Sequence, residues 1–182
     1  DYTIRKILMY LRFRFRFKQV NQEQPNDPLS NFIDIMTTSI RYQVEWPFGN
    51  RIRMNNRFEA LQNHSEPDGK HYGYLISQDI AYKSASIPIS VSARYTLFDT
   101  YSYDERIYSY ETDVLYGYSV PAFDGKGIRC FLLASWSPWR NLEIWFRYAQ
   151  TFYSDRDVIG TGLEEINGNS KSEIKAQLMV RF

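Results

Sequence analysis

Cysteine and histidine are scarce in this chain, and their scarcity excludes several kinds of site. The 182 residues include one cysteine, Cys130, and two histidines. A single cysteine cannot form a disulfide within the chain, and one cysteine with two histidines does not supply the ligands of a structural zinc site. We therefore expect no zinc, and we expect Cys130 to pack as an apolar side chain.

Long apolar runs and an excess of one charge are also missing. Apolar runs such as residues 7–11 fall far short of the ~20 residues that a membrane-spanning helix needs. The 22 Lys and Arg are balanced by 21 Asp and Glu, which disfavours nucleic acid as a partner because its binders usually carry a basic excess. No signal peptide is recognisable. Because export needs one, we expect a processed N-terminus or more chain upstream.

Aromatic residues, in contrast, are abundant, with 15 Tyr, 12 Phe and 4 Trp making up 17% of the chain. Tyr and Trp suit a membrane–water boundary because each joins an apolar ring to a polar tip. A soluble β-sandwich core would also use aromatic residues, but girdles at the two rims of a membrane barrel are favoured. The girdle candidates are Trp46, Trp136, Trp139, Tyr72, Tyr74, Tyr82, Tyr116, Tyr118 and Phe182.

Apolar and polar residues alternate from one end of the chain to the other. Phe13, Phe15 and Phe17 share one face of the first such stretch, and arginines occupy the other, which a strand achieves and a helix does not. The same pattern predicts nine strands, at residues 9–18, 36–46, 51–59, 71–83, 87–97, 108–118, 128–137, 142–152 and 173–182.

The length of these strands favours a membrane barrel over a soluble sheet. The ranges given run 9–13 residues, whereas soluble strands average ~5–6 and a membrane strand needs ~9–11. Tight turns are expected at 47–49, 84–86 and 138–140, and longer loops at 22–31, 63–70, 99–106 and 155–169. Short turns on one side and long loops on the other are typical of outer-membrane barrels.

The order of the connections contains a conflict. Counting sides forward from the N-terminus and backward from Phe182 gives opposite results. Either a strand is miscounted between Asp99 and Ile128, or that segment folds inward. An odd count of nine also suggests a missing strand, because single-chain bacterial barrels are even-numbered.

Two features resemble known outer-membrane proteins. The final strand alternates up to a terminal aromatic, as does the assembly signal of outer-membrane barrels, and here the signal would comprise Leu178, Val180 and Phe182. The stretches DERIYSYETDVLYGYSVPAF (104–123) and IGTGLEEINGNSKSEIK (159–175) resemble the C-terminal barrel region of uncharacterised Bacteroidota outer-membrane proteins. Those proteins are often labelled by an upstream helix-hairpin-helix domain, which this sequence lacks. The resemblance covers most of the chain, carries no assigned activity, and implies the tail of a longer barrel.

The charged faces of the strands admit two interpretations. A candidate basic lumen face comprises Arg12, Arg14, Arg16, Lys18, Arg51, Arg53 and Arg57. It could select anionic solutes, as charged rings do in pores. Alternatively, these residues pair with acids on other strands and fill a narrow barrel, which is favoured because the two signs nearly balance. The acids are Glu45, Glu59, Asp79, Glu111, Asp113, Glu143 and Glu173.

Candidates for catalysis or metal binding are weak. His64 and His71 flank a polar stretch, which invites an outer-membrane hydrolase or protease with a rim site, but Pro-Asp-Gly within it favours a solvated turn. The acidic loops could bind calcium, yet they lack EF-hand spacing. These loop acids are Asp99, Asp104, Glu105, Asp155, Asp157, Glu164 and Glu165. No catalytic, cofactor or metal residue is therefore assigned.

The sequence predicts an all-β, antiparallel transmembrane barrel of the bacterial outer membrane. It would span residues 1–182, as a single domain or as the C-terminal part of a longer, even-numbered barrel. The expected role is structural, pore-forming or scaffolding, without catalysis. The expected partners are lipopolysaccharide, phospholipid, the barrel assembly machinery and other outer-membrane or lipoprotein subunits. The alternatives are the rim hydrolase and a soluble lipocalin-like binding barrel, which would turn its apolar faces inward.

Overall fold

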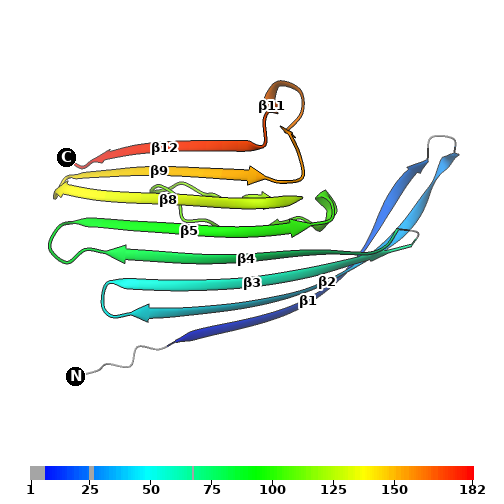
Figure 1. Ribbon diagram of the computed structural model, residues 1–182, viewed down its shortest axis with the longest axis horizontal. Helices are drawn as coiled ribbons and strands as arrows, with labels where there is room; N and C mark the ends of the chain where they lie inside the picture. The colour runs from blue at the N-terminus through cyan, green and yellow to red at the C-terminus, as the bar shows by residue number, and fades with distance from the viewer. Residues whose placement is uncertain (1–6, 25–26, 67) are drawn as a thin grey trace.

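The computed structural model describes residues 7–24, 27–66 and 68–182, and most of them form one antiparallel sheet (Figure 1). Its strands follow one another in chain order as β1-β2-β3-β4-β5-β8-β9-β12. Each strand pairs with the one before it, so the sheet is a meander. The strands are β1 (Leu8–Gln24), β2 (Asp27–Phe48), β3 (Ile52–Ser65), β4 (Gly69–Lys83), β5 (Ile89–Thr100), β8 (Lys126–Trp139), β9 (Leu142–Tyr153) and β12 (Ser170–Val180).

The remaining elements are short. Two-residue strands form two small ladders, β6 (Ile107–Tyr108) with β7 (Ala122–Phe123) and β10 (Val158–Ile159) with β11 (Ile166–Asn167). Two 3-10 turns, η1 (Tyr103–Glu105) and η2 (Gly162–Glu164), complete the chain. Within the described residues, no helical element is long and apolar enough to cross a membrane. The all-β, antiparallel prediction is confirmed.

The sheet is open among the described residues. Strand β1 pairs with β2 and strand β12 pairs with β9, and no ladder joins β1 to β12 in the part of the chain that the structure describes. These two strands therefore present free edges. The expected closure into a barrel is not seen in this chain taken alone.

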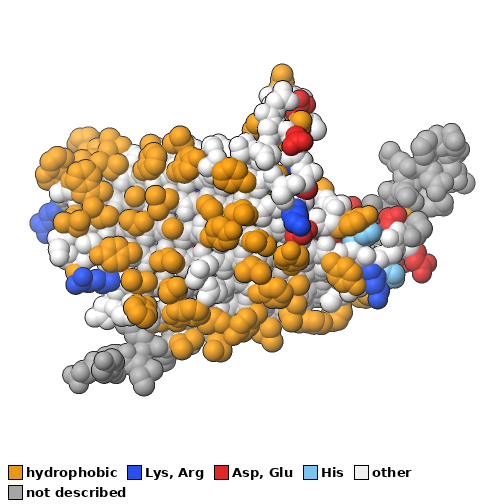
Figure 2. All heavy atoms as spheres, in the orientation of Figure 1, with side chains coloured by type: hydrophobic (Ala, Val, Ile, Leu, Met, Phe, Trp, Pro, Cys, Tyr) orange, Lys and Arg blue, Asp and Glu red, His pale blue; other side chains and the backbone are white. Residues whose placement is uncertain are grey.

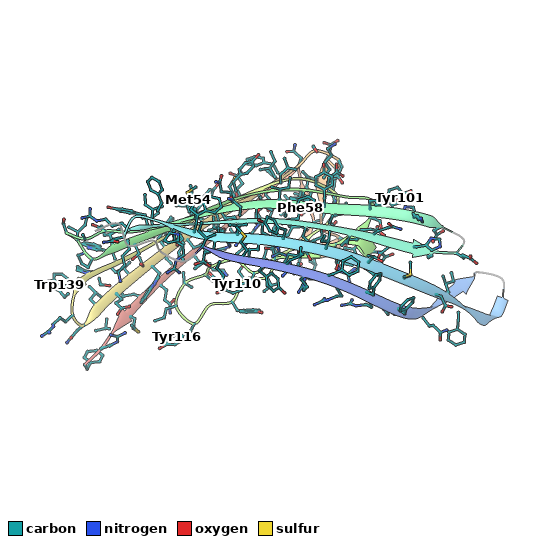
Figure 3. The ribbon with its side chains drawn as sticks, turned by 90° about the horizontal axis from the view of Figure 1, so that it is seen from below. Met54, Phe58, Tyr101, Tyr110, Tyr116 and Trp139 are labelled. Carbon is teal, nitrogen blue, oxygen red and sulfur yellow. The ribbon has the colours of Figure 1, made fainter. Side chains whose placement is uncertain are left out.

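Of the nine expected strands, the one at residues 108–118 is wrong. Only Ile107–Tyr108 of this region pairs as a strand, and an isolated bridge joins Glu111 to Ser119. A turn follows, in which the Gly117 N–H donates to the Val114 carbonyl oxygen at 2.8 Å. The region belongs to a connection, residues 101–125, that lies against one face of the sheet (Figure 3). Its alternation arises because every second side chain contacts the sheet.

The inward-folding alternative is thus confirmed, and with it the conflict in sidedness disappears. With eight strands, the connections 49–51, 84–88 and 140–141 all lie at one end of the sheet (Figure 1). Both long connections, 101–125 and 154–169, leave and rejoin the sheet at the opposite end. The three tight turns were expected within two residues of these positions.

Two of the expected loops are wrong because the strands continue through them. Strand β1 extends to Gln24 and β2 begins at Asp27, so little of the predicted 22–31 loop remains. Likewise β3 extends to Ser65 and β4 begins at Gly69, within the predicted 63–70 loop. Backbone pairing satisfies N–H and C=O groups whatever the side chains are, so polar sequence alone does not end a hairpin.

The two faces of the sheet have opposite character. We call the face that carries residues 101–125 the inner face, and the other the outer face. The outer face exposes apolar side chains on every strand, and Figure 2 shows them spread across the sheet with charges gathered toward its ends. The inner face buries charged and hydroxyl side chains, among them Arg57, Glu59, Thr96, Arg129 and Arg147. This arrangement is the reverse of a water-soluble sheet.

Two small apolar clusters attach residues 101–125 to the inner face. Leu75 and Phe98 of the sheet pack with Ile107 and Phe123 of the connection. Phe131, Leu133, Trp145 and Ala149 form the second cluster, against which Val114 and Leu115 pack. Gly73 permits the close approach, because a Cβ there would lie 3.1 Å from the Glu105 carbonyl oxygen.

Candidate functional site

The chemistry of the inner face centres on Glu111, a fully buried carboxylate of the 101–125 connection. Arg129 on β8 donates to it through Nε at 2.9 Å and through Nη2 at 3.1 Å. Arg147 on β9 donates to its Oε2 at 2.5 Å and is itself fully buried. Paired N–H donors from a guanidinium are among the strongest hydrogen bonds to a carboxylate. Glu111 therefore anchors the connection to two strands.

A second anchor joins the connection to the edge strand β12. Lys175 Nζ lies 2.5 Å from Asp113 Oδ2, and the Val114 N–H donates to Oδ1 at 2.9 Å. Burial by itself raises the pKa of Asp113, but the hydrogen bonds from Lys175 and Val114 and the charges of Lys175 and Arg147 lower it below its ordinary value. Asp113 is therefore ionised wherever this pair is formed.

On the part of the inner face formed by β8, β9 and β12, positive and negative charges balance. Glu173 on β12 lies 3.3 Å from Arg129 and 3.6 Å from Arg147, which completes a group of three acids and three bases with Glu111, Asp113 and Lys175. Buried charges are tolerated only when they are paired in this way. The ion-pair interpretation of the charged faces therefore fits β8, β9 and β12.

Near β1 to β3 the balance is lost. The Glu59 carboxylate is contacted by Arg41 at 2.8 Å, by Arg12 at 3.3 Å and by Arg57, so three bases share one acid. Arg57 also donates to the Ser109 hydroxyl at 2.8 Å and to the Tyr108 carbonyl oxygen at 3.0 Å. The inner face of β1–β3 therefore binds the 101–125 connection and still carries more positive than negative side chains.

The basic residues of this region line a groove of about 350 Å³ between β1–β3 and the connection. Two carboxylates, Glu59 and Asp104, face six cations there: Arg12, Arg14, Arg16, Lys18, Arg41 and Arg106. Among the described residues, no ion pair or hydrogen bond engages the side chains of Arg14, Arg16 or Lys18. We call this feature the basic groove.

Arg106 is held rigidly at the rim of the basic groove. Its guanidinium stacks 4.0 Å from the Tyr103 ring, and its Nε donates to the Tyr108 hydroxyl at 2.7 Å. Its Nη1 donates to the Tyr103 carbonyl oxygen at 2.8 Å. The hydrogen bond to Tyr108 raises the pKa of Arg106.

The structure separates the seven residues of the predicted basic face. Arg12, Arg14, Arg16 and Lys18 line the basic groove, and Arg57 is buried beside it. The remaining two lie toward the 49–51 turn, where Arg53 pairs with Glu45 at 3.2 Å and Arg51 shares a separate hollow with Lys83. Arg51 and Arg53 therefore form no common site with β1.

The predicted rim site for hydrolysis does not assemble. His64 and His71 lie on opposite faces of the sheet, since Phe58 and His64 share the outer face of β3 whereas Leu75 and His71 share the inner face of β4. The His64 ring contacts the Gly69 carbonyl oxygen at 3.2 Å, and His71 stacks on Tyr101 at 4.0 Å. Within the described residues, neither ring contacts a carboxylate.

Three of the loop acids have protein partners, and one of them, Asp99, lies 3.4 Å from Lys126. Asp155 accepts hydrogen bonds from Arg156, and burial, which raises the pKa of Asp155, is outweighed by that hydrogen bond and charge, which lower it. Glu105 binds the Ser102 hydroxyl at 2.6 Å and the Asn63 amide at 2.9 Å. No group of three metal-ligating side chains occurs in the part of the chain that the structure describes.

No family model, curated protein or solved structure matches the chain.

The aromatic girdle itself stays a prediction, and its candidate residues differ in exposure, with Trp46 half-buried. Trp136, Trp139, Tyr72, Tyr74 and Tyr82 are exposed near strand ends. Tyr116 and Tyr118 are exposed too, but they belong to the 101–125 connection on the inner side of the sheet (Figure 3), so they are not girdle residues. Leu178, Val180 and Phe182 are exposed at the end of the chain, and their role in assembly stays a prediction.

Five inner-face cations were missing from the predicted basic face: Arg41, Arg106, Arg129 and Arg147, described above, and Arg94 of β5, whose Nη2 donates to Asp79 at 2.8 Å. Four of them alternate with apolar residues on their strands, so their shared face was visible in the sequence. Arg106 follows η1 and carried no such signal. What the sequence could not give was the register that places Arg41 opposite Glu59.

Proposed function

We propose that this chain forms part of the wall of an outer-membrane β-barrel, with lipid against the outer face and water within. One observation carries the proposal: all eight strands expose apolar side chains on one face, and, except near strand ends where residues such as Asp99 and Lys126 face outward, they turn their charges to the other. Soluble monomers rarely expose contiguous apolar patches of such extent. Membrane barrels alternate apolar residues outward and polar residues inward.

The dimensions of the outer face support this proposal. On β8 the outward residues run from Ile128 through Leu132 to Trp136, eight residue steps that span about 26 Å of strand. The apolar band of outer-membrane barrels is about 25 Å tall. Gln78 and Gln150 interrupt the outer face, and Gln150 accepts a hydrogen bond from the Tyr148 hydroxyl at 2.9 Å.

The free edges of β1 and β12 imply that the proposed barrel contains further strands. In hydrocarbon every backbone N–H and C=O must be paired, so only a closed sheet is stable there. We infer that further strands, from the same polypeptide or from another chain, join the two edges. The 101–125 connection would then narrow the lumen of the completed barrel.

The alternatives fit the structure less well. A lipocalin-like barrel needs an apolar interior, whereas the inner face here buries Arg57, Glu59, Arg129 and Arg147. A rim hydrolase needs a His–carboxylate or Ser–His pair, and His64 and His71 provide none among the described residues. The resemblance to Bacteroidota outer-membrane proteins stays a prediction.

Extraction of the intact natural protein tests the proposal. The chain should need detergent for extraction, and its gel mobility should change on boiling because closed barrels resist detergent until heated. The mass of the intact polypeptide measures how much chain completes the sheet. Full solubility without detergent would contradict the proposal.

A further inference from the structure

The basic groove has more positive charge than the protein uses. Six cations and two carboxylates line it, and Glu59 is already shared by Arg12, Arg41 and the adjacent Arg57. On the inner face of β8, β9 and β12, by contrast, three acids and three bases neutralise each other. Clustered like charges repel and destabilise a fold unless something binds them. The excess therefore points to a ligand of opposite charge.

The spacing of the cations describes that ligand. Arg12, Arg14, Arg16 and Lys18 are alternate residues on β1, so they share the inner face at intervals of about 7 Å. From Arg12 to Lys18 the row covers about 20 Å. A compact anion could meet one or two of these side chains, whereas an extended anion with repeated charges meets them all.

The type of cation indicates the charged group. Five of the six are arginines, whose planar guanidinium donates two parallel hydrogen bonds to an oxyanion and suits phosphate in particular. Arg106 is oriented in advance by Tyr103 and Tyr108, which lowers the entropy lost on binding. The three side chains without an ion pair, those of Arg14, Arg16 and Lys18, are exposed and accessible to solvent.

We infer that the basic groove binds an extended solute that carries several phosphate groups. In the proposed barrel this site would face the aqueous lumen, next to the narrowing made by residues 101–125. The inference goes beyond the barrel proposal and has a separate readout, because phosphate binding reports on the groove and the heat-dependent gel shift reports on closure.

Inorganic polyphosphate, in linear chains long enough to cover the row from Arg12 to Lys18, is a suitable probe, measured by calorimetry on the intact detergent-extracted protein at about 0.1 M salt. The test variant combines Arg14→Gln, Arg16→Gln and Lys18→Gln, which break no ion pair among the described residues. The control variant combines Lys70→Gln, Arg140→Gln and Lys171→Gln, three exposed cations outside the groove that remove the same charge. We expect at least a tenfold loss of affinity in the test variant and less than a twofold change in the control.

A second measurement needs no variant. Amine acylation followed by mass spectrometry should show that the polyphosphate protects Lys18 and leaves Lys70 and Lys171 reactive. Lack of polyphosphate binding by the natural protein would overturn the inference. So would equal loss in the two triple variants, or equal protection of all three lysines, because either result means general charge attraction instead of a site.

Discussion

Arg129 donates two hydrogen bonds to the completely buried carboxylate of Glu111, from Nε to Oε1 at 2.9 Å and from Nη2 to Oε2 at 3.1 Å. The two residues belong to β8 and to the 101–125 connection. Because Arg147 contacts the same carboxylate, one acid side chain holds the connection against two neighbouring strands. This contact acts together with the Asp113–Lys175 pair and the two apolar clusters to hold the connection on the inner face.

Glu111→Gln should loosen the connection. The substitution leaves Arg129 and Arg147 sharing Glu173, with Asp113 3.8 Å from Arg147, and breaking a buried pair costs about 3–5 kcal/mol. We expect chymotrypsin to cut within residues 101–125 at least tenfold faster than in the natural protein. Glu165→Gln, at an exposed carboxylate, is the control and should leave the rate unchanged. Equal rates in both variants would show that Glu111 does not anchor the connection.

Acid should release the Asp113–Lys175 contact. The pKa of Asp113 is lowered below its ordinary value of 3.8, so its contribution to stability is fully present above that value and is lost as the pH falls through the lower, folded-state pKa. We expect the difference in thermal midpoint between the natural protein and Asp113→Asn to be constant above about pH 5 and to shrink below pH 4. Circular dichroism from pH 7 to pH 2.5 measures it. A difference that grows in acid would refute the assignment.

A charge at the middle of the outer face should prevent insertion into lipid. Leu132 lies midway along the outward residues of β8 and is 47% exposed. In a bilayer, Leu132→Arg should cost roughly 2–4 kcal/mol, and the folded yield in phospholipid vesicles should fall accordingly. Leu163→Arg, at a fully exposed position in the 154–169 connection, should fold as the natural protein does. If both variants insert equally well, Leu132 does not face hydrocarbon.

Loss of both histidines should leave function unchanged. The double variant His64→Ala and His71→Ala removes one contact with the Gly69 carbonyl oxygen and one stacking contact with Tyr101, both near the end of the β3–β4 pair. We expect the heat-dependent gel shift and any lipid or peptide cleavage measured with the natural protein to persist. Loss of a cleavage activity in this variant would revive the rim hydrolase.

The alternation of side chains predicted the strands of the sheet well because successive side chains of a strand point to opposite faces, which here differ in polarity. The same rule failed at residues 108–118, where Ser109, Glu111 and Asp113 face the sheet and Tyr110 and Tyr118 face away. An extended segment packed on a polar surface acquires the period of a strand without pairing as one. The sequence alone cannot distinguish the two cases, although the conflict in sidedness located the error.

The candidate site was predictable only in part. That Arg12, Arg14, Arg16 and Lys18 share a face follows from their spacing on one strand. That Arg12 lies opposite Arg41, and Arg41 opposite Glu59, depends on register across two ladders. That Arg106 closes the groove depends on the inward path of the 101–125 connection. Neither fact is local, so neither could be inferred from the pattern of one strand.

Spin labels along β12 would test most directly whether the outer face meets lipid and the inner face does not. Single cysteines at 174–178, in a Cys130→Ala background, would be labelled in the intact protein in phospholipid vesicles. Our account predicts that oxygen, which concentrates in hydrocarbon, reaches labels at Ile174, Ala176 and Leu178 much more than those at Lys175 and Gln177, and that a water-soluble nickel chelate is excluded from the first three. Uniform oxygen access, or nickel access at Ile174, Ala176 and Leu178, would contradict it.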